Sequence, residues 1–168
     1  ETVKPFLCRG VCLNVAKALN KEVLGPDYEI TVADLEAAQK LAGLEINEGD
    51  VVLIGTGWSK NWENKDLYQG QSLGTPGIGE AGAKWLAAKK PRACGGETIA
   101  FEHIPAGAGH RELPVHRVFL VESGIHIIET MKLDELAETG VNEFLFVLTP
   151  LNLQGATGSP TRPLAVLV

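Results

Sequence analysis

Val51–Ile54 is a run of four apolar residues, three of them β-branched, and it predicts a strand that is buried on both faces. Strands of this kind belong to sheets that helices cover. Helical signals stand on both sides of the run. Thr31 lies three residues before Asp34, as in a capping box, and residues 78–89 have the composition of a second helix. The alternation of strand and helix signals predicts an α/β domain with a mixed sheet.

The remaining elements follow from apolar patterning and from glycine and proline positions. We expect further strands at 6–16, 92–96, 125–128 and 144–148. We expect helices after Thr31, with an apolar face of Leu35, Ala38, Leu41 and Ala42 ended by Gly43, from Pro114 to Gly124, and over 133–138. Residues 59–75 form a long polar excursion of the length that functional lids or interfaces have.

The C-terminal segment Gly155–Pro163, GATGSPTRP, concentrates residues that shape the backbone. Glycines open conformations closed to other residues, prolines fix φ, and the hydroxyls bond locally. Arg162 is its only charge, and the apolar run 164–168 closes the chain. The segment predicts a tight loop that leads into a final buried strand, with an ordinary connecting loop as the alternative.

Length and charge restrict the function classes. A chain of 168 residues with 45% hydrophobic content is long enough for one domain, 1–168. Its 15 Lys+Arg against 21 Asp+Glu, with no basic run, argue against nucleic acid or a membrane surface as partner and favour a small molecule or a protein. Apolar runs are too short to span a bilayer, the start does not resemble a signal peptide, and Cys8, Cys12 and Cys94 predict no disulfide framework. We therefore expect a soluble, cytoplasmic protein.

Two glycine-rich strand ends predict one shared site. Gly55–Trp58 follows the buried strand, and Gly95–Thr98 follows the next one. In open α/β sheets ligands bind beyond the carboxyl ends of strands. Trp58 and Thr98 are therefore candidate substrate contacts, although Trp58 could equally cap the core. Glu97 and Glu102 are the candidate catalytic carboxylates.

His116 and Glu129 form the candidate metal pair. Imidazole and carboxylate are suitable ligands for zinc or manganese, and a helix followed by a returning strand could bring the two together. A catalytic metal takes three or more protein ligands, and the chain has no HExxH pair to supply others. From spacing alone, the alternative is a solvated histidine and a surface acid. Loop histidines such as His103 and His110 carry less weight.

Five blocks in this order resemble the cyclase family of metal-dependent hydrolases, which includes proteins similar to bacterial kynurenine formamidase and isatin hydrolase. The blocks are DVVLIGTGW, PGIGEAGAKWLA, GGETIAFE, LPVHRVFLVESGIHIIETMKLDEL and EFLFVLTPLNLQGATGSPTRPLAV. The resemblance runs from about Arg9 to Val168, and the ordered set is far more specific than any single block.

The resemblance implies a swivelling β/β/α fold, a homodimer or higher oligomer, and hydrolysis of a cyclic or acyl amide or a lactone by a water on manganese or zinc. It assigns His116 and Glu129 to the metal centre and Glu102 to the acid of this branch. Glu97 stands where the family has Asp, and Ile99 where this branch often has Trp.

The family motif His-x-Gly-Thr-His-x-Asp is absent from this chain. In the family it supplies most metal ligands and lies upstream of the block that matches residues 9–16. We expect one of three situations: a fragment, a site completed by another chain, or a non-catalytic relative that keeps the scaffold. In the last case the competing function is small-molecule binding without turnover.

Overall fold

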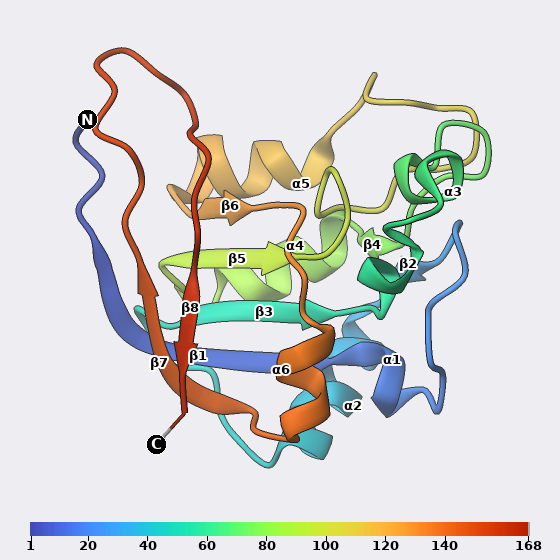
Figure 1. Cartoon of the computed structure of the whole chain (residues 1–168), viewed down its shortest axis with the longest axis horizontal. Helices are drawn as coiled ribbons and strands as arrows, with labels where there is room; N and C mark the ends of the chain where they lie inside the picture. The colour runs from blue at the N-terminus through green and yellow to red at the C-terminus, as the bar shows by residue number, and fades with distance from the viewer. Residues whose placement is uncertain (168) are drawn as a thin grey trace.

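A six-stranded mixed sheet runs through the centre of the computed structural model, which describes residues 1–167 (Figure 1). The strand order is β6-β5-β3-β1-β7-β8. The bounds are β1 Phe6–Asn14, β3 Val51–Gly55, β5 Ala93–Gly96, β6 His126–Ile128, β7 Glu143–Leu148 and β8 Leu164–Val166. Strands β6, β5, β3 and β1 pair with one another in parallel. Strand β7 pairs antiparallel with β1, and β8 pairs antiparallel with β7. The two short strands β2 Glu29–Ile30 and β4 Gly77–Ile78 form a separate parallel pair. The prediction of an α/β domain with a mixed sheet is confirmed.

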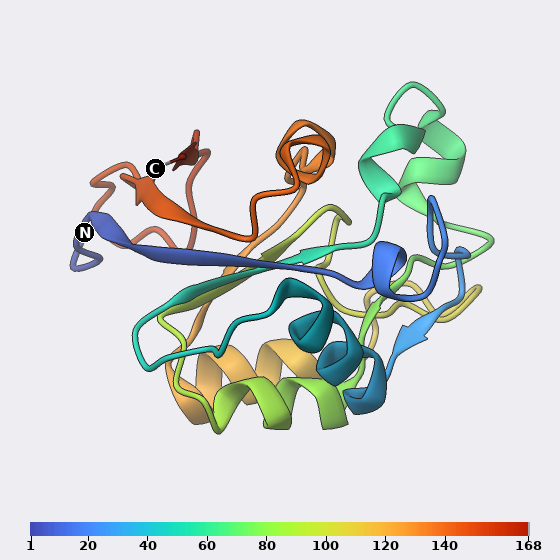
Figure 2. The ribbon, with the colours of Figure 1, turned by 90° about the horizontal axis from the view of Figure 1, so that it is seen from below.

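Helices cover the two faces of the sheet unequally. Figure 2 shows α2, α4 and the α5–η2 helix together beneath the sheet, with α6 on the opposite side. The bounds are α1 Val15–Ala18, α2 Val32–Ala42, η1 Trp58–Asn61, α3 Lys65–Gln69, α4 Glu80–Ala87, α5 Pro114–His116, η2 Arg117–Ser123 and α6 Asp134–Thr139. The helix-covered face holds the larger core, and Phe144, Phe146 and Leu53 belong to a second core on the other face.

Helix α2 shows how local signals set element boundaries. Thr31 accepts a hydrogen bond from the backbone N–H of Asp34, whose side chain in turn accepts from the Thr31 backbone, so the capping box is confirmed. Gly43 ends the helix at φ +68°. The prediction that Leu41 belongs to the apolar face is wrong, because its side chain lies at the helix's outer edge and is 52% exposed.

The helix that begins at Pro114 changes its winding after His116. Residues 114–116 form an α-helical turn, and Arg117–Ser123 continue as a π-helix that ends at Gly124, at φ +66°. The boundaries agree with the sequence, but the π winding has no local signal in it. Such wider turns occur often at functional sites.

The C-terminal strand departs from expectation. We predicted a buried strand over 164–168, but β8 is exposed throughout Leu164–Val166, and Val168 lies outside the described residues. The reason is position: β8 is the edge strand, paired only with β7. The Gly155–Pro163 segment is likewise an exposed loop, in which the Ser159 hydroxyl accepts a hydrogen bond from the Leu151 N–H.

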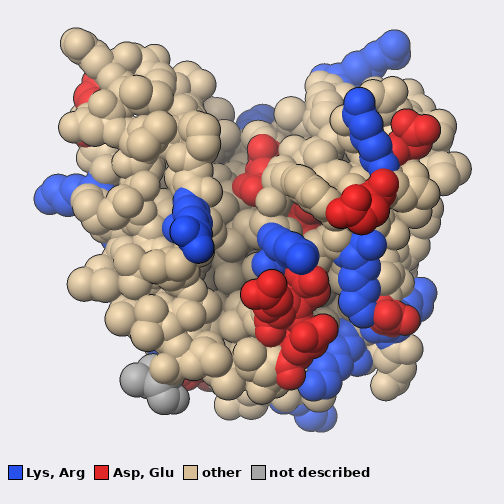
Figure 3. Space-filling view, viewed as in Figure 1, with Lys and Arg blue, Asp and Glu red and all other residues tan. Residues whose placement is uncertain are grey.

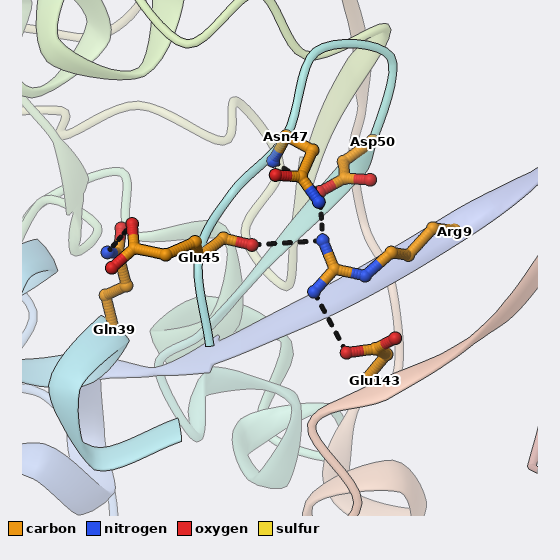
Figure 4. A network of polar contacts seen from close by, with 6 residues as sticks. All are labelled: Arg9, Gln39, Glu45, Asn47, Asp50 and Glu143. Carbon is orange, nitrogen blue, oxygen red and sulfur yellow. Dashed lines mark hydrogen bonds and ion pairs between the residues drawn. The ribbon is translucent and has the colours of Figure 1, made fainter. Parts of the chain in front are cut away.

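Arg9 ties three separate segments together at the amino end of β3 (Figure 4). Its guanidinium contacts Asp50 at 2.7 Å and Glu143 at 2.9 Å, and it donates to the Glu45 carbonyl at 3.0 Å. Asp50 is 3% exposed and also accepts from the Asn47 N–H. The cation therefore compensates a carboxylate that the fold has taken out of water.

Replacing Arg9 with Met should lower the free energy of unfolding by about 2 kcal/mol, because the buried Asp50 carboxylate loses its counter-charge. Lys60→Met provides the control, since it breaks the exposed ion pair with Glu22, for which we expect little change. Urea unfolding at pH 7 measures both. Equal effects of the two substitutions would contradict this role of Arg9.

Candidate metal centre

The carboxyl ends of three parallel strands bring the predicted site residues to one edge of the sheet. Strand β3 pairs with β5 so that Ile54 lies opposite Gly96, and β5 pairs in turn with β6. The segments that follow these strands carry Thr56, Glu97 and Glu129. The two glycine-rich strand ends therefore meet. This is the edge at which open α/β sheets bind ligands.

Glu97 anchors the loop that follows β3. It is 1% exposed, and both of its oxygens accept hydrogen bonds from that loop. Oε2 accepts from the N–H and hydroxyl of Thr56 at 2.5 and 2.7 Å and from the Gly57 N–H at 2.7 Å, while Oε1 accepts from the N–H and hydroxyl of Ser59 at 3.3 and 2.6 Å. Five donors fill the acceptor sites of a carboxylate. The geometry gives Glu97 a positioning role, because both of its oxygens are occupied by donors of the loop.

The loop that Glu97 holds is tight. Gly57 has φ +73°, and a Cβ there would lie 2.2 Å from the backbone oxygen of Glu22. Only glycine fits such a position without displacing backbone. The loop therefore depends on both a residue without a side chain and an anion that gathers its N–H groups.

Trp58 and Thr98 are both internal. Trp58 is 1% exposed, and its indole N–H donates to the Tyr68 carbonyl at 3.0 Å. The structure thus gives Trp58 the core-capping role that the sequence left as its alternative. Thr98 is also 1% exposed, and its carbonyl accepts a hydrogen bond from the Thr130 N–H at 3.0 Å.

Glu102 meets the start of α5. It is 1% exposed, and its carboxylate accepts from the N–H groups of Val115 and His116 at 3.0 and 3.1 Å. The same carboxylate contacts His116 Nδ1 at 2.5 Å. Glu102 therefore fixes both the backbone and the ring of His116.

His116 lies between two carboxylates. Its Nε2 is 3.2 Å from Oε1 of Glu129, on the side of the ring opposite Glu102. The hydrogen bond to Glu102 contributes most to raising the pKa of His116, and the hydrogen bond to Glu129 contributes next. Together they raise this pKa to about 9. In the metal-free chain the imidazole is therefore protonated at neutral pH. The structure brings the candidate metal pair together, as the resemblance implied.

This arrangement fits a divalent metal. Two ligand atoms about 2.1 Å from a tetrahedral zinc lie about 3.4 Å apart, close to the 3.2 Å between His116 Nε2 and Glu129 Oε1. A carboxylate on the second ring nitrogen, here Glu102, is the usual partner of a metal-bound histidine. Within residues 1–167, however, no group of three or more His, Cys, Asp or Glu side chains is placed to hold a metal.

Backbone strain flanks both carboxylates that contact His116. Phe101, just before Glu102, has φ +61°, and Thr130, just after Glu129, has φ +57°. Residues other than glycine adopt such angles rarely, and they cluster at functional sites. The sequence carries no signal for either position. The strain therefore marks this edge of the sheet independently of the residue types.

The two loop histidines, His103 and His110, lie away from the His116–Glu129 pair. His103 pairs with Asp27, Nε2 to Oδ1 at 2.9 Å, and His110 lines a separate cavity. Neither ring belongs to the His116–Glu129 pair.

A groove of about 490 Å³ begins beside Glu129. Thr130 and Met131 line it on one side, and the C-terminal residues 161–165 line the other. Figure 3 shows the molecule hollowed between the C-terminal segment on the left and the acidic side chains near α6. The turn-rich C-terminal segment therefore reaches the candidate centre, with Arg162 in the wall of the groove.

None of the helices in the described part of the chain is long and apolar enough to cross a membrane.

Comparison with known proteins identifies relatives of this chain. The sequence model of the family described as Putative cyclase matches residues 1–103. Isatin hydrolase of Roseibium aggregatum is 26% identical over 158 residues, which is 92% of this chain and 59% of that protein. Cyclase-like protein 2 of Oryza sativa subsp. japonica is 31% identical over 103 residues, 61% of this chain and 35% of the relative.

Solved structures share the fold. A crystal structure of a novel cyclase superposes with a TM-score of 0.85 at 31% identity, covering 96% of this chain and 54% of the other. An isatin hydrolase bound to the product analogue thioisatinate gives a TM-score of 0.76 at 22% identity, covering 94% of this chain and 59% of the other. The chain thus spans between about a third and three-fifths of the length of these relatives.

Proposed function

Because this chain belongs to the cyclase family, we propose that it carries part of the active site of a metal-dependent hydrolase that cleaves a cyclic or acyl amide, or a lactone. The observation that carries the proposal is the Glu102–His116–Glu129 arrangement, with a nitrogen and an oxygen ligand 3.2 Å apart. Relatives described as an isatin hydrolase and as a potential metal-dependent hydrolase with cyclase activity support the reaction class.

Each residue of the arrangement has a distinct task. A bound manganese or zinc ion would supply an activated water and polarise the substrate carbonyl. His116 Nε2 and a Glu129 oxygen would hold the ion. Glu102 accepts a hydrogen bond from the Nδ1–H of His116, which would leave the Nε2 lone pair free for an ion that Glu129 also holds. Glu97 would not hold the ion itself. It acts indirectly, because it keeps the loop after β3 in place.

The remaining ligands must come from outside the pair. A catalytic zinc takes three protein ligands, and His116 and Glu129 supply two. We propose that a further polypeptide segment, of the same kind as the family's His-x-Gly-Thr-His-x-Asp motif, lies in the groove beside Glu129 and completes the centre. Since this chain lacks the motif, a different chain or a part of the protein outside these residues would provide it.

The ligand count also favours a second candidate function. A scaffold relative that binds a small molecule at this edge, without turnover, would need neither a third ligand nor a stable metal. Metal binding distinguishes the two functions when it is measured on this chain together with the segment that completes the centre. The hydrolase requires a bound metal, and the scaffold does not.

We expect manganese and zinc to bind to this chain, weakly, through His116 and Glu129. In isothermal titration calorimetry at pH 7.5, His116→Ala and Glu129→Gln should each weaken binding by roughly tenfold or more, the effect of losing a ligand or its support. His103→Ala is the matched control, because His103 pairs with Asp27 away from the centre. Equal affinities of all three variants would place the metal elsewhere and remove the main support for the hydrolase.

A further inference from the structure

A second cavity lies away from the Glu129 groove. Its volume is about 590 Å³, and it lies between the end of α3 with the loop that follows it, residues 69–75, and the loop 107–111. An isolated bridge between Thr75 and Ile104 joins the base of the two segments, which approach each other at the upper right of Figure 1. Volumes of this size suit small organic ligands.

Thr75 lies at the base of this cavity. The residue is 1% exposed, and its Oγ1 is buried with no hydrogen-bond partner among the described residues. Its N–H and carbonyl both pair with Ile104, so the Thr75 backbone joins the two segments that form the cavity, while its hydroxyl is not open to a ligand.

The base of the cavity is closely packed around Thr75. A Cβ on Gly70 would lie 2.4 Å from the Thr75 methyl group, and a Cβ on Gly74 would lie 2.4 Å from the Ile104 carbonyl oxygen. Both glycines have positive φ, +62° and +79°. Side chains at these two positions would displace Thr75 and Ile104, so both positions require glycine.

The cavity is positively charged in an acidic protein. Arg111 and His110 line it together with the amides of Gln69 and Gln71, and no Asp or Glu of the described residues does, although the chain carries a net charge of −6. Ile99 and Ile104 provide an apolar wall. A cation, neutral hydrogen-bonding groups and an apolar surface together match a carboxylate with an apolar body.

We propose that this cavity binds a small organic carboxylate. Arg111 pairs with the carboxylate, and Ile99 and Ile104 pack against its apolar part. The proposal goes beyond the hydrolase function and requires no metal, so it can be tested on the metal-free chain.

The test compares benzoate with benzamide, which has the same shape and no charge. Titrations followed by two-dimensional NMR in EDTA report both affinity and location. Arg111→Gln should lower the affinity for benzoate by roughly tenfold, as expected for one charge-assisted hydrogen bond. The same substitution should change the affinity for benzamide by less than about twofold.

Lys40→Gln is the matched control, because it removes the same charge from α2 and should leave both affinities unchanged. Benzoate-induced shifts should centre on residues 70–75 and 107–111. Shifts centred elsewhere, the same benzoate affinity in Arg111→Gln and wild type, or no binding up to about 10 mM would each overturn the proposal.

Discussion

Substituting Glu97 with Leu should lower the free energy of unfolding by about 3–5 kcal/mol, the range for removing one member of a buried charged network. The carboxylate is 1% exposed and receives five hydrogen bonds from Thr56, Gly57 and Ser59. Leucine fills the volume but leaves those donors in the interior without an acceptor, at about 1–3 kcal/mol for each group that water does not reach. Urea unfolding at neutral pH measures the difference.

Two further substitutions make the test specific. Glu97→Gln keeps one oxygen but turns an NH₂ group toward donors, so we expect a loss smaller than that of Glu97→Leu. Glu129→Gln changes a half-exposed carboxylate at the same edge of the sheet, where water can replace the lost contact. A Glu97→Leu loss no larger than that of Glu129→Gln would show that the five hydrogen bonds do not hold the loop.

Much of the fold could be predicted because its signals are local. The Thr31–Asp34 capping box, Gly43 and Gly124 set helix ends through backbone groups within a few residues. The run Val51–Ile54 predicted a strand buried on both faces, and β3 is buried along its length. These features depend on the chain near each residue, and the sequence displays that directly.

The predictions were wrong where the burial of a residue depends on neighbours that lie far from it in the sequence. Leu164–Val166 has the composition of a buried strand, but its burial depends on whether another strand lies beyond it, and here it is the edge. Apolar composition does not distinguish these cases. The same applies to Leu41, which has the right spacing for the apolar face but is 52% exposed.

The candidate site was predicted only in part, for the same reason. Spacing suggested that strand ends carrying Trp58 and Glu97 would meet, but the resemblance to the cyclase family, and not spacing, favoured His116 with Glu129. Glu102 contacts His116 directly after Phe101, whose positive φ has no turn-forming residue to signal it in the sequence. The hydrogen bonds of Glu97 span 38–41 residues of sequence, so their donors could not be assigned before the structure.

The metal-free chain should lose stability as the pH rises through the weakly alkaline range. The pKa of His116 is about 9 in the folded chain and about 6.5 in an unfolded one. The folded state therefore holds this proton more tightly. Its contribution is fully present below pH 6.5, decreases above it, and is lost above about pH 9. The imidazole is 24% exposed, and we expect a decrease on the order of 2–3 kcal/mol, measured by urea unfolding in EDTA.

Glu102→Gln tests the cause, because the hydrogen bond to Glu102 contributes most to the raised pKa of His116. The amide oxygen can take the place of Oε1 and still accept from the His116 N–H, whereas the Val115 N–H, which donates to Oε2, loses its acceptor when the charge is removed. The pH dependence between 6.5 and 9 should therefore flatten, whatever the absolute loss of stability. A wild-type profile that is already flat, or an equally steep one in Glu102→Gln, would mean that the carboxylate does not hold the His116 proton, and Glu102 would no longer qualify as the residue that orients the ring toward a metal.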